Sequence, residues 1–358
     1  MIETIKGGCQ EKINRFLVHY RLRDGDTIGE TNLSTPVNVF DDSPGSFYGA
    51  IMPTNGVKAV FVPSNYSNIG LYNCSTNTFT KGPLHNAQTT EAFHKGVQIN
   101  NNTILFCPYK SDAIGLYNYV NNTYQDGPSV SGFTRQNTAF GRFIKAVLVQ
   151  NMVYLIPESA RNIGIYNTDN NTISQGPAIT HDEDLVAKKF SDAVQISDNE
   201  ILLIPNSDYY FYIYNIKDNT ITRGTNTTLA PGGLIAAVRV DNEVFIAGST
   251  GRIGVYNISN STFNNYSGER SYAGSPTFSD IVIYGNKIIL VPKKSFYVGE
   301  FDISTKTYTR GNAGIAIDPS MTYRNLYNGA CRMNDVIVMA PSHTQNVGLY
   351  KPESIIAT

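Results

Sequence analysis

A short aromatic phrase recurs seven times along this chain of 358 residues. It reads IGLYN, IGLYN, IGIYN, YIYN, IGVYN, VGEFD and VGLYK, and its aromatic residues are Tyr72, Tyr117, Tyr166, Tyr214, Tyr256, Phe301 and Tyr350. Successive aromatic residues lie 42 to 49 positions apart. A repeat of this length indicates one supersecondary unit that is copied around an axis or along a line.

Each unit consists of four short strand-like segments. In residues 143–177, the apolar runs FIKAVLV and MVYLI are separated by the turn QN, and IGIYN is separated from TISQG by the turn TDNN. Short strands joined by such turn residues form an antiparallel meander. The second segment of most units is almost continuously apolar, which is typical of a strand covered on both faces.

A meander covered on both faces has to pack between copies of itself, as the four-stranded blades of a β-propeller do around a central channel. We therefore predict an all-β, seven-bladed β-propeller of four-stranded antiparallel blades. The rungs of a β-helix, the rival solenoid, are shorter than this spacing. The predicted repeats span roughly 46–82, 93–127, 143–176, 190–224, 234–268, 278–311 and 326–358.

The propeller is predicted to occupy residues 16–358 as a single domain, after an N-terminal arm at 1–15. The arm is either a disordered tail or a contact for assembly with a partner. The segment 19–32 resembles residues 214–226, so we expect part of 16–32 to join the last blade and close the ring. Ile355–Thr358 is the competing source of that strand, and an incomplete eighth blade is the alternative.

Composition excludes several classes of function. A formal net charge of −1 argues against nucleic acid as a partner. There is no apolar window long enough to span a membrane and no hydrophobic signal core at the N-terminus. The cysteines Cys9, Cys74, Cys107 and Cys331 are scattered, and we expect free, mostly buried thiols. These features favour a cytoplasmic or virion protein that is not classically secreted.

The order of features within a unit resembles the kelch repeat. The segments LYNCSTNTFTKGP (71–83) and LYNYVNNTYQDGP (116–128) carry the Tyr-Asn step, the polar turn, Asn-Thr, an aromatic residue and the proline loop of that family. The strand pair AVLVQNMVYLIP (146–157) matches the family's next strands. The resemblance covers residues 46–351, although prolines replace the Gly-Gly pair and the chain has no tryptophan. It implies a propeller that presents its loops to another protein.

One side of this propeller is predicted to be the binding face. The loops from second to third strand and from blade to blade share a side and are long, whereas the opposite turns are short and polar. Long loops on a rigid scaffold are the usual place for recognition. At the channel mouth on this side we predict Tyr48, His94, Lys95, Lys145, Asp192, Asp280, Tyr327 and Asn328, and in its loops Tyr66, Tyr109, Tyr209, Tyr210, Phe296 and Tyr297. The mouth residues either bind a ligand or neutralise one another around a water-filled channel.

Three kinds of function are compatible with these residues. A non-enzymatic scaffold for a protein partner is the first, because tyrosine is favoured at interfaces. A structural or host-recognition protein of a virus or phage, with possible glycan binding, is the second, since the chain is rich in Asn, Tyr and Ile. A kelch-like enzyme such as a copper oxidase is the third.

Nothing in the sequence supports the third reading. The five histidines fall in different units, whereas copper is held by clustered imidazoles. The segment HDED at 181–184 could hold a hard cation, but a solvated acidic loop is the favoured explanation. No catalytic, metal or cofactor residue is therefore predicted, and the chain is predicted not to be an enzyme.

Overall fold

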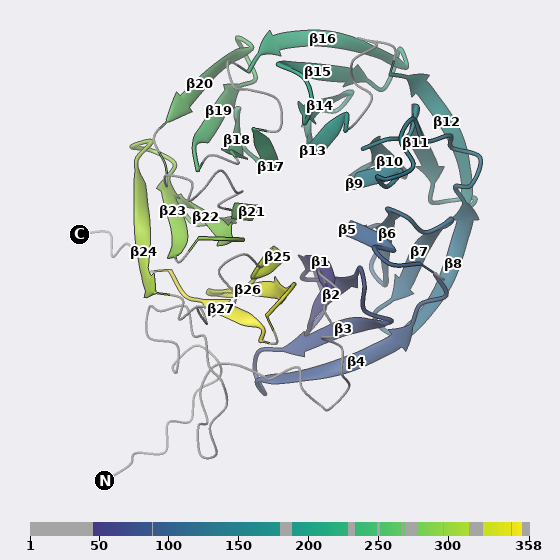
Figure 1. Ribbon diagram of the computed structural model, residues 1–358, viewed down its shortest axis with the longest axis horizontal. Helices are drawn as coiled ribbons and strands as arrows, with labels where there is room; N and C mark the ends of the chain where they lie inside the picture. The colour runs from purple at the N-terminus through teal and green to yellow at the C-terminus, as the bar shows by residue number, and fades with distance from the viewer. Residues whose placement is uncertain are drawn as a thin grey trace.

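The computed structural model describes residues 46–352, apart from 88, 180–187, 228–232, 249–250, 267, 269–277, 296, 315–324 and 345. Seven antiparallel sheets are arranged as a ring around a central axis (Figure 1), and no helix occurs in the described residues. The predicted seven-bladed propeller is confirmed. Six sheets have four strands each, and the seventh has three among these residues.

Each blade runs outward from its first strand, which lies nearest the axis (Figure 1). The first three blades contain β1 Phe47–Ile51, β2 Ala59–Pro63, β3 Asn68–Asn73 and β4 Thr78–Leu84; β5 Phe93–Gln98, β6 Thr103–Pro108, β7 Ala113–Asn118 and β8 Thr123–Ser129; and β9 Phe143–Val149, β10 Met152–Pro157, β11 Asn162–Asn167 and β12 Thr172–Ala178. The next two contain β13 Phe190–Ser197, β14 Glu200–Pro205, β15 Tyr210–Asn215 and β16 Thr220–Asn226; and β17 Leu234–Val240, β18 Glu243–Gly248, β19 Ile253–Asn257 and β20 Thr262–Tyr266. The last two contain β21 Phe278–Tyr284, β22 Lys287–Pro292, β23 Tyr297–Asp302 and β24 Tyr308–Gly314; and β25 Tyr327–Met333, β26 Val336–Pro341 and β27 Gly348–Tyr350.

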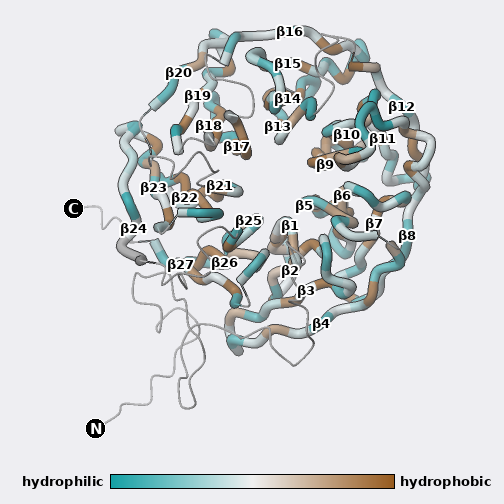
Figure 2. Tube along the Cα trace, in the orientation of Figure 1, coloured by the Kyte–Doolittle hydropathy of each residue, from teal (hydrophilic) through white to brown (hydrophobic). Residues whose placement is uncertain are grey.

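The core lies between adjacent blades. The second strands, such as β2 and β6, are buried along nearly their whole length, as their apolar sequences predict. Hydrophobic segments recur within the sheets in Figure 2, whereas hydrophilic segments recur along outer strands such as β8. The glycine of the repeated phrase lies under a large ring, because a Cβ at Gly70 or Gly115 would contact Phe47 or Phe93. Each phrase therefore fixes the packing of its own blade.

The tyrosine of the phrase fastens the next turn in four blades. The Tyr72 hydroxyl donates to Asn77 Oδ1 at 2.7 Å, and three other blades repeat this bond at 2.9 to 3.0 Å with Tyr117–Asn122, Tyr166–Asn171 and Tyr214–Asn219. These four asparagines have φ between 51° and 55°. Asparagine tolerates this left-handed conformation better than most residues, so the same side chain both shapes the turn and accepts the bond.

One aromatic residue begins the first strand of most blades and pairs with the residue that ends the second strand. Phe47 pairs with Pro63, Phe93 with Pro108, and Phe278 with Pro292. In the last blade Tyr327, rather than Leu326, pairs with Pro341 and packs against Gly348. Tyr327 is therefore a fully buried core residue, and its predicted place at the channel mouth is wrong.

The ring closes between the last and first blades. One hydrophobic cluster joins Phe47 and Phe61 of the first blade to Val338 and Leu349 of the last, and Ser46 N–H donates to the Ser342 carbonyl at 3.2 Å. The arm at 1–15, the segment 16–32 and Ile355–Thr358 lie outside the described residues. Which of these supplies a fourth strand to the last blade therefore stays a prediction.

The cysteines differ from the expectation in one respect. Cys107 and Cys331 are free and buried, as predicted. Cys74 is disulfide-bonded, so the expectation of a free thiol is wrong at that position. Cys9 lies outside the described residues.

Candidate functional site

Four charged side chains meet in the centre of the ring. Each stands two residues after the aromatic residue that begins its strand, at a register shift in the pairing of first and second strands. Lys95 Nζ lies 2.6 Å from Asp192 Oδ2 and 3.8 Å from Asp280 Oδ1, and Lys145 Nζ lies 2.9 Å from Asp192 Oδ1. We call Lys95, Lys145, Asp192 and Asp280 the central charge cluster.

Asp192 is the most enclosed member of the central charge cluster. Its side chain is 0% exposed, and it also accepts the backbone N–H groups of Ala193 and Ala237 at 2.8 and 3.1 Å. Burial alone would raise the pKa of this carboxyl, but Lys145 and Lys95 outweigh burial and lower it. Burial likewise opposes the charge on Lys95, while Asp192 and Asp280 raise its pKa.

The central charge cluster is balanced, with two cations and two carboxylates in mutual contact. Of the two readings left open by the sequence, these contacts fit charges that neutralise one another in the channel. The equivalent positions in the first and last blades are Gly49 and Gly329, with φ of 122° and 104°, and their backbones touch. No fifth charge is present at this level among the described residues.

A stack of three aromatic rings lies beside the central charge cluster. His94 is sandwiched between Tyr48 and Tyr109, with ring centroids 3.8 and 3.5 Å apart and planes within 14° of parallel. Burial lowers the pKa of His94 well below its usual value, and the nearby Lys188 and Lys293 act in the same direction. The imidazole is therefore neutral at pH 7, and its buried Nδ1 has no hydrogen-bond partner.

A second set of equivalent residues lies on the loop face, at the end of the second strands. It consists of the residue that directly follows the proline at the end of each second strand. We call these residues the mouth ring; they are Ser64, Tyr109, Glu158, Asn206, Lys293 and Ser342. The corresponding residue of the fifth blade, Ser249, lies outside the described residues.

A belt of backbone hydrogen bonds holds the mouth ring in place. In five blades, the N–H of the mouth-ring residue donates to the carbonyl of the residue that precedes the first strand, at 2.9 to 3.0 Å. The mouth-ring carbonyl then accepts the N–H of the corresponding residue in the next blade, as between Tyr109 and Arg142 at 2.7 Å. In these five blades the side chains therefore differ while the backbone bond is the same.

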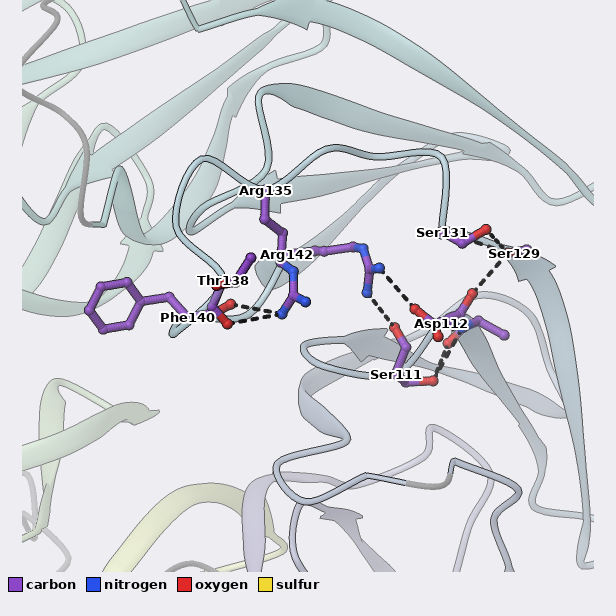
Figure 3. A network of polar contacts seen from close by, with 9 residues as sticks. Ser111, Asp112, Ser129, Ser131, Arg135, Thr138, Phe140 and Arg142 are labelled. Carbon is purple, nitrogen blue, oxygen red and sulfur yellow. Dashed lines mark hydrogen bonds and ion pairs between the residues drawn. The ribbon is translucent and has the colours of Figure 1, made fainter.

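The long loop at 130–142 is held by arginines (Figure 3). Arg142 Nη2 lies 2.8 Å from Asp112 Oδ1, and Nη1 donates to the Ser111 carbonyl at 3.3 Å. Arg135 donates to the carbonyls of Thr138 and Phe140 at 3.4 and 3.2 Å. The Arg135 guanidinium thus stabilises its own loop, and the Arg142 guanidinium ties this loop to the neighbouring one at Ser111 and Asp112.

The predicted loop-face aromatics divide into two groups. Tyr66 packs on Phe47 and Tyr109 on His94, so both are buried and serve the structure of the mouth. Tyr209 is 49% exposed. Tyr210 and Tyr297 are half-buried, with Arg223 and Arg310 over their rings at 3.7 and 4.9 Å. Phe296 lies outside the described residues.

The remaining residues predicted at the channel mouth directly follow the aromatic residue that begins the first strand of their blades. Tyr48 and His94 occupy the level just before the central charge cluster, and Asn328 occupies the same position in the last blade, where its Nδ2 donates to Ser342 Oγ at 2.9 Å. Burial, partly opposed by Lys95, raises the pKa of the Tyr48 phenol to about 12, so this group stays protonated.

Sequence reasoning missed a hollow on the opposite face. It has a volume of about 230 Å³ and lies between the first two blades, beside Pro53, Tyr117 and Tyr119. Val57 and Val120 also line it and are 69% and 65% exposed. The available signal was the apolar Val120 in a turn position where five other blades have Ser75, Asp169, Lys217, Ser259 and Ser304.

The described residues contain neither a cluster of metal-binding side chains nor a helix that could span a membrane. No group of three or more histidine, cysteine, aspartate or glutamate side chains gathers among the described residues. The segment His181–Asp184 is not among them. Within the described part of the chain, no helix is long and apolar enough to cross a membrane.

The comparisons with known proteins identify the fold alone. No family model and no curated protein matches this chain. The extracellular domain of a putative one-component system from B. thetaiotaomicron is similar over 87% of this chain, with a TM-score of 0.63 and 8% identity; the match spans 42% of that chain. The computationally designed Ika8 protein is similar over 86% of this chain and 96% of its own, with a TM-score of 0.55 and 10% identity.

Proposed function

We propose that the protein is a non-enzymatic, kelch-like binding propeller that presents its loop face to a protein partner. The observation that carries this proposal is the loop face, where a repeated belt of backbone hydrogen bonds holds loops whose aromatic side chains Tyr209, Tyr210 and Tyr297 stay at least partly exposed. A rigid scaffold with a varied set of side chains is how propellers and other repeat folds acquire specificity.

The accessible aromatic groups support a protein partner. Tyr209 projects into solvent, and Tyr210 and Tyr297 carry arginines over their rings. Tyrosine and arginine are the residues most enriched where binding energy concentrates in protein interfaces. We place this interface over the fourth to sixth blades, because these residues lie in the fourth and sixth.

The test compares partner capture by variants of the two faces. The wild-type protein, a loop-face variant (Tyr209→Ala with Tyr297→Ala) and an opposite-face variant (Val57→Ser with Val120→Ser) are purified from the native source with what they bind. Quantitative mass spectrometry should find a partner that the loop-face variant loses at least tenfold and the opposite-face variant retains. The reverse pattern, or equal retention by both variants, would refute the proposal.

A second candidate is a structural or host-recognition protein at the surface of a virus or phage particle, where the ligand would be a glycan. The disulfide at Cys74 favours it over a cytoplasmic protein, because disulfides persist in oxidising surroundings such as virion surfaces. Binding of the purified protein to an array of glycans tests this candidate, and the absence of any bound glycan would count against it.

We propose no enzymatic activity and no nucleic-acid partner. The charged groups of the channel are engaged with one another, and His94 is enclosed between two rings. Turnover by any hydrolase or oxidase assay that the loop-face variant abolishes would contradict this.

A further inference from the structure

The hollow on the face opposite the long loops lies where two blades depart from the repeat. The loop between β1 and β2 covers residues 52–58, whereas the corresponding turns of the other blades cover only 99–102, 150–151, 198–199, 241–242, 285–286 and 334–335. Val120 is the second departure, since five other blades have a polar residue at its position. Both departures line the same hollow, although the blade fold is built without them elsewhere in the ring.

The lining of the hollow is mainly apolar. Val57 and Val120, on its two sides, are two of the four large apolar side chains that are exposed in the described part of the chain. The other apolar side chains that line it are Pro53, Val60, Leu71, Tyr117 and Tyr119. Single exposed apolar residues are ordinary, but exposed apolar residues gathered at one depression are typical of a binding site.

Hydrogen bonds between the two blades hold the walls of the hollow in place. Thr54 donates its backbone N–H and its hydroxyl to Gln98 Oε1 at 2.8 and 3.1 Å, and Gln98 Nε2 donates to the Tyr119 hydroxyl at 3.2 Å. Within the loop, the Gly56 N–H donates to the Pro53 carbonyl at 2.9 Å. The long loop of the first blade is therefore fixed against the second blade, and a preformed site orders few groups when a ligand binds.

The polar side chains of the hollow are donors without a facing carboxylate. Lys58 lines it and forms no ion pair with any described residue. Asn122 accepts the Tyr117 hydroxyl at Oδ1, which leaves its Nδ2 group to donate. No aspartate or glutamate is among the described residues that line the hollow. A ligand that complements these groups has an apolar body and a negative charge.

The volume of the hollow limits the size of that ligand. An apolar cavity of about 150 Å³ holds benzene, and this hollow has a volume of about 230 Å³. It therefore accommodates an aromatic group of about two fused rings, but not a helix or a strand of another protein. We propose that the hollow binds a small aromatic carboxylate, with its ring between Val57 and Val120 and its carboxylate at Lys58. This site is independent of the loop-face partner, because it lies on the opposite face.

The experiment follows valine methyl groups by NMR while indole-3-propionate is added to the full-length protein at pH 7. The signals are assigned with Val57→Ser, Val120→Ser and Val240→Ala. Val240 is the matched control, since it is half-buried at the corresponding end of β17 in the fifth blade. The signals of Val57 and Val120 should shift and saturate with a Kd of about 1 mM or tighter, as expected for a ligand of about 14 non-hydrogen atoms. Equal shifts at all three valines, or no saturable shift at Val57 and Val120, would overturn the proposal.

A second measurement tests the charge at Lys58. Indole-3-propionamide has the same ring without the negative charge, so the wild type should bind it about two- to fivefold more weakly than the carboxylate. Lys58→Met keeps the aliphatic stem and should abolish this difference. Lys217→Met, which removes an exposed lysine from the turn position equivalent to Val120 in the fourth blade, should retain it. Equal affinity of the wild type for both compounds, or a preference for the carboxylate that persists in Lys58→Met, would contradict the assignment.

Discussion

Replacing Asp192 by asparagine removes the charge that holds the centre of the ring together. The Asp192 carboxylate, in the fourth blade, bonds Lys95 of the second blade and Lys145 of the third. It also accepts the backbone N–H of Ala237 in the fifth blade. An asparagine of the same shape retains an oxygen for one backbone bond. It leaves two lysines facing an uncharged group.

The loss in the free energy of unfolding depends on which partners the two lysines keep. Removing one member of a buried ion pair costs about 3–5 kcal/mol. Asp280 still lies 3.8 Å from Lys95, and the Lys145 side chain is 24% exposed and keeps some hydration. We therefore expect the lower end, about 3 kcal/mol at pH 7. For a chain of 358 residues, an unfolding entropy of about 2.1 cal/mol/K per residue converts this to a loss of about 4 °C in Tm.

The pH dependence has a defined sign. The folded pKa of Asp192 is depressed, so its contribution is fully present above the unfolded pKa, near 4, and is lost as the pH falls through the folded value. The difference between wild type and Asp192→Asn should therefore be constant from pH 5 to 7 and shrink below pH 4. Thermal unfolding followed by circular dichroism across this range measures it.

A matched control is Asp218→Asn, which removes an exposed aspartate from a turn and should change Tm by less than about 1 °C. A loss below about 1 kcal/mol in Asp192→Asn, or one that does not diminish in acid, would refute the argument. The lysines would then be hydrated in an open channel instead of being held by the carboxylate.

Two further predictions concern the repeat. Ser261 has φ of 55° and occupies the position at which four blades have an asparagine bonded to the tyrosine of the phrase. Ser261→Asn should therefore bond Tyr256 and raise Tm by about 1–2 °C in thermal unfolding. No increase in Tm would show that this bond adds no stability. Gly329 has φ of 104° and lies against Gly49, so Gly329→Ala should lower the free energy of unfolding by about 2–5 kcal/mol. Gly285 has φ of 55° and faces open space, so Gly285→Ala should lower it by only about 1–2 kcal/mol. Equal losses in chemical denaturation would contradict the close approach of the first and last blades.

The fold was predictable because one phrase determines one blade. The aromatic residue, the glycine beneath a large ring and the polar turn recur together, and each is explained by contacts within the blade or with its neighbour. Such local, repeated contacts leave a regular trace in the sequence. The register of the last blade was harder to predict, because Leu326 and Tyr327 are both apolar and both suit the spacing to Pro341. Only the pairing of Tyr327 with Pro341 distinguishes them.

The candidate site was predictable in position and not in orientation. Tyr66 and Tyr109 were assigned to the loop face because of their place in the chain, but Tyr66 turns toward Phe47 of its own blade and Tyr109 toward His94. A loop position does not determine the direction of a side chain, since that depends on what space the neighbouring side chains leave. The same holds for the mouth ring, whose members are found only when the prolines of all blades are compared in register.

The ion pairs of the channel show why position alone was insufficient. Lys95 and Asp192 are 97 residues apart and come from the second and fourth blades, yet their side chains meet because ring closure brings alternate blades to one centre. Register predicts that both side chains point inward, and it says nothing about which charges will touch. In the central charge cluster each charged side chain is paired with one of opposite sign, whereas at the mouth ring Lys293 has no carboxylate partner among the described residues. Which charges touch is therefore decided by the closure of the ring and not by the register of any single blade.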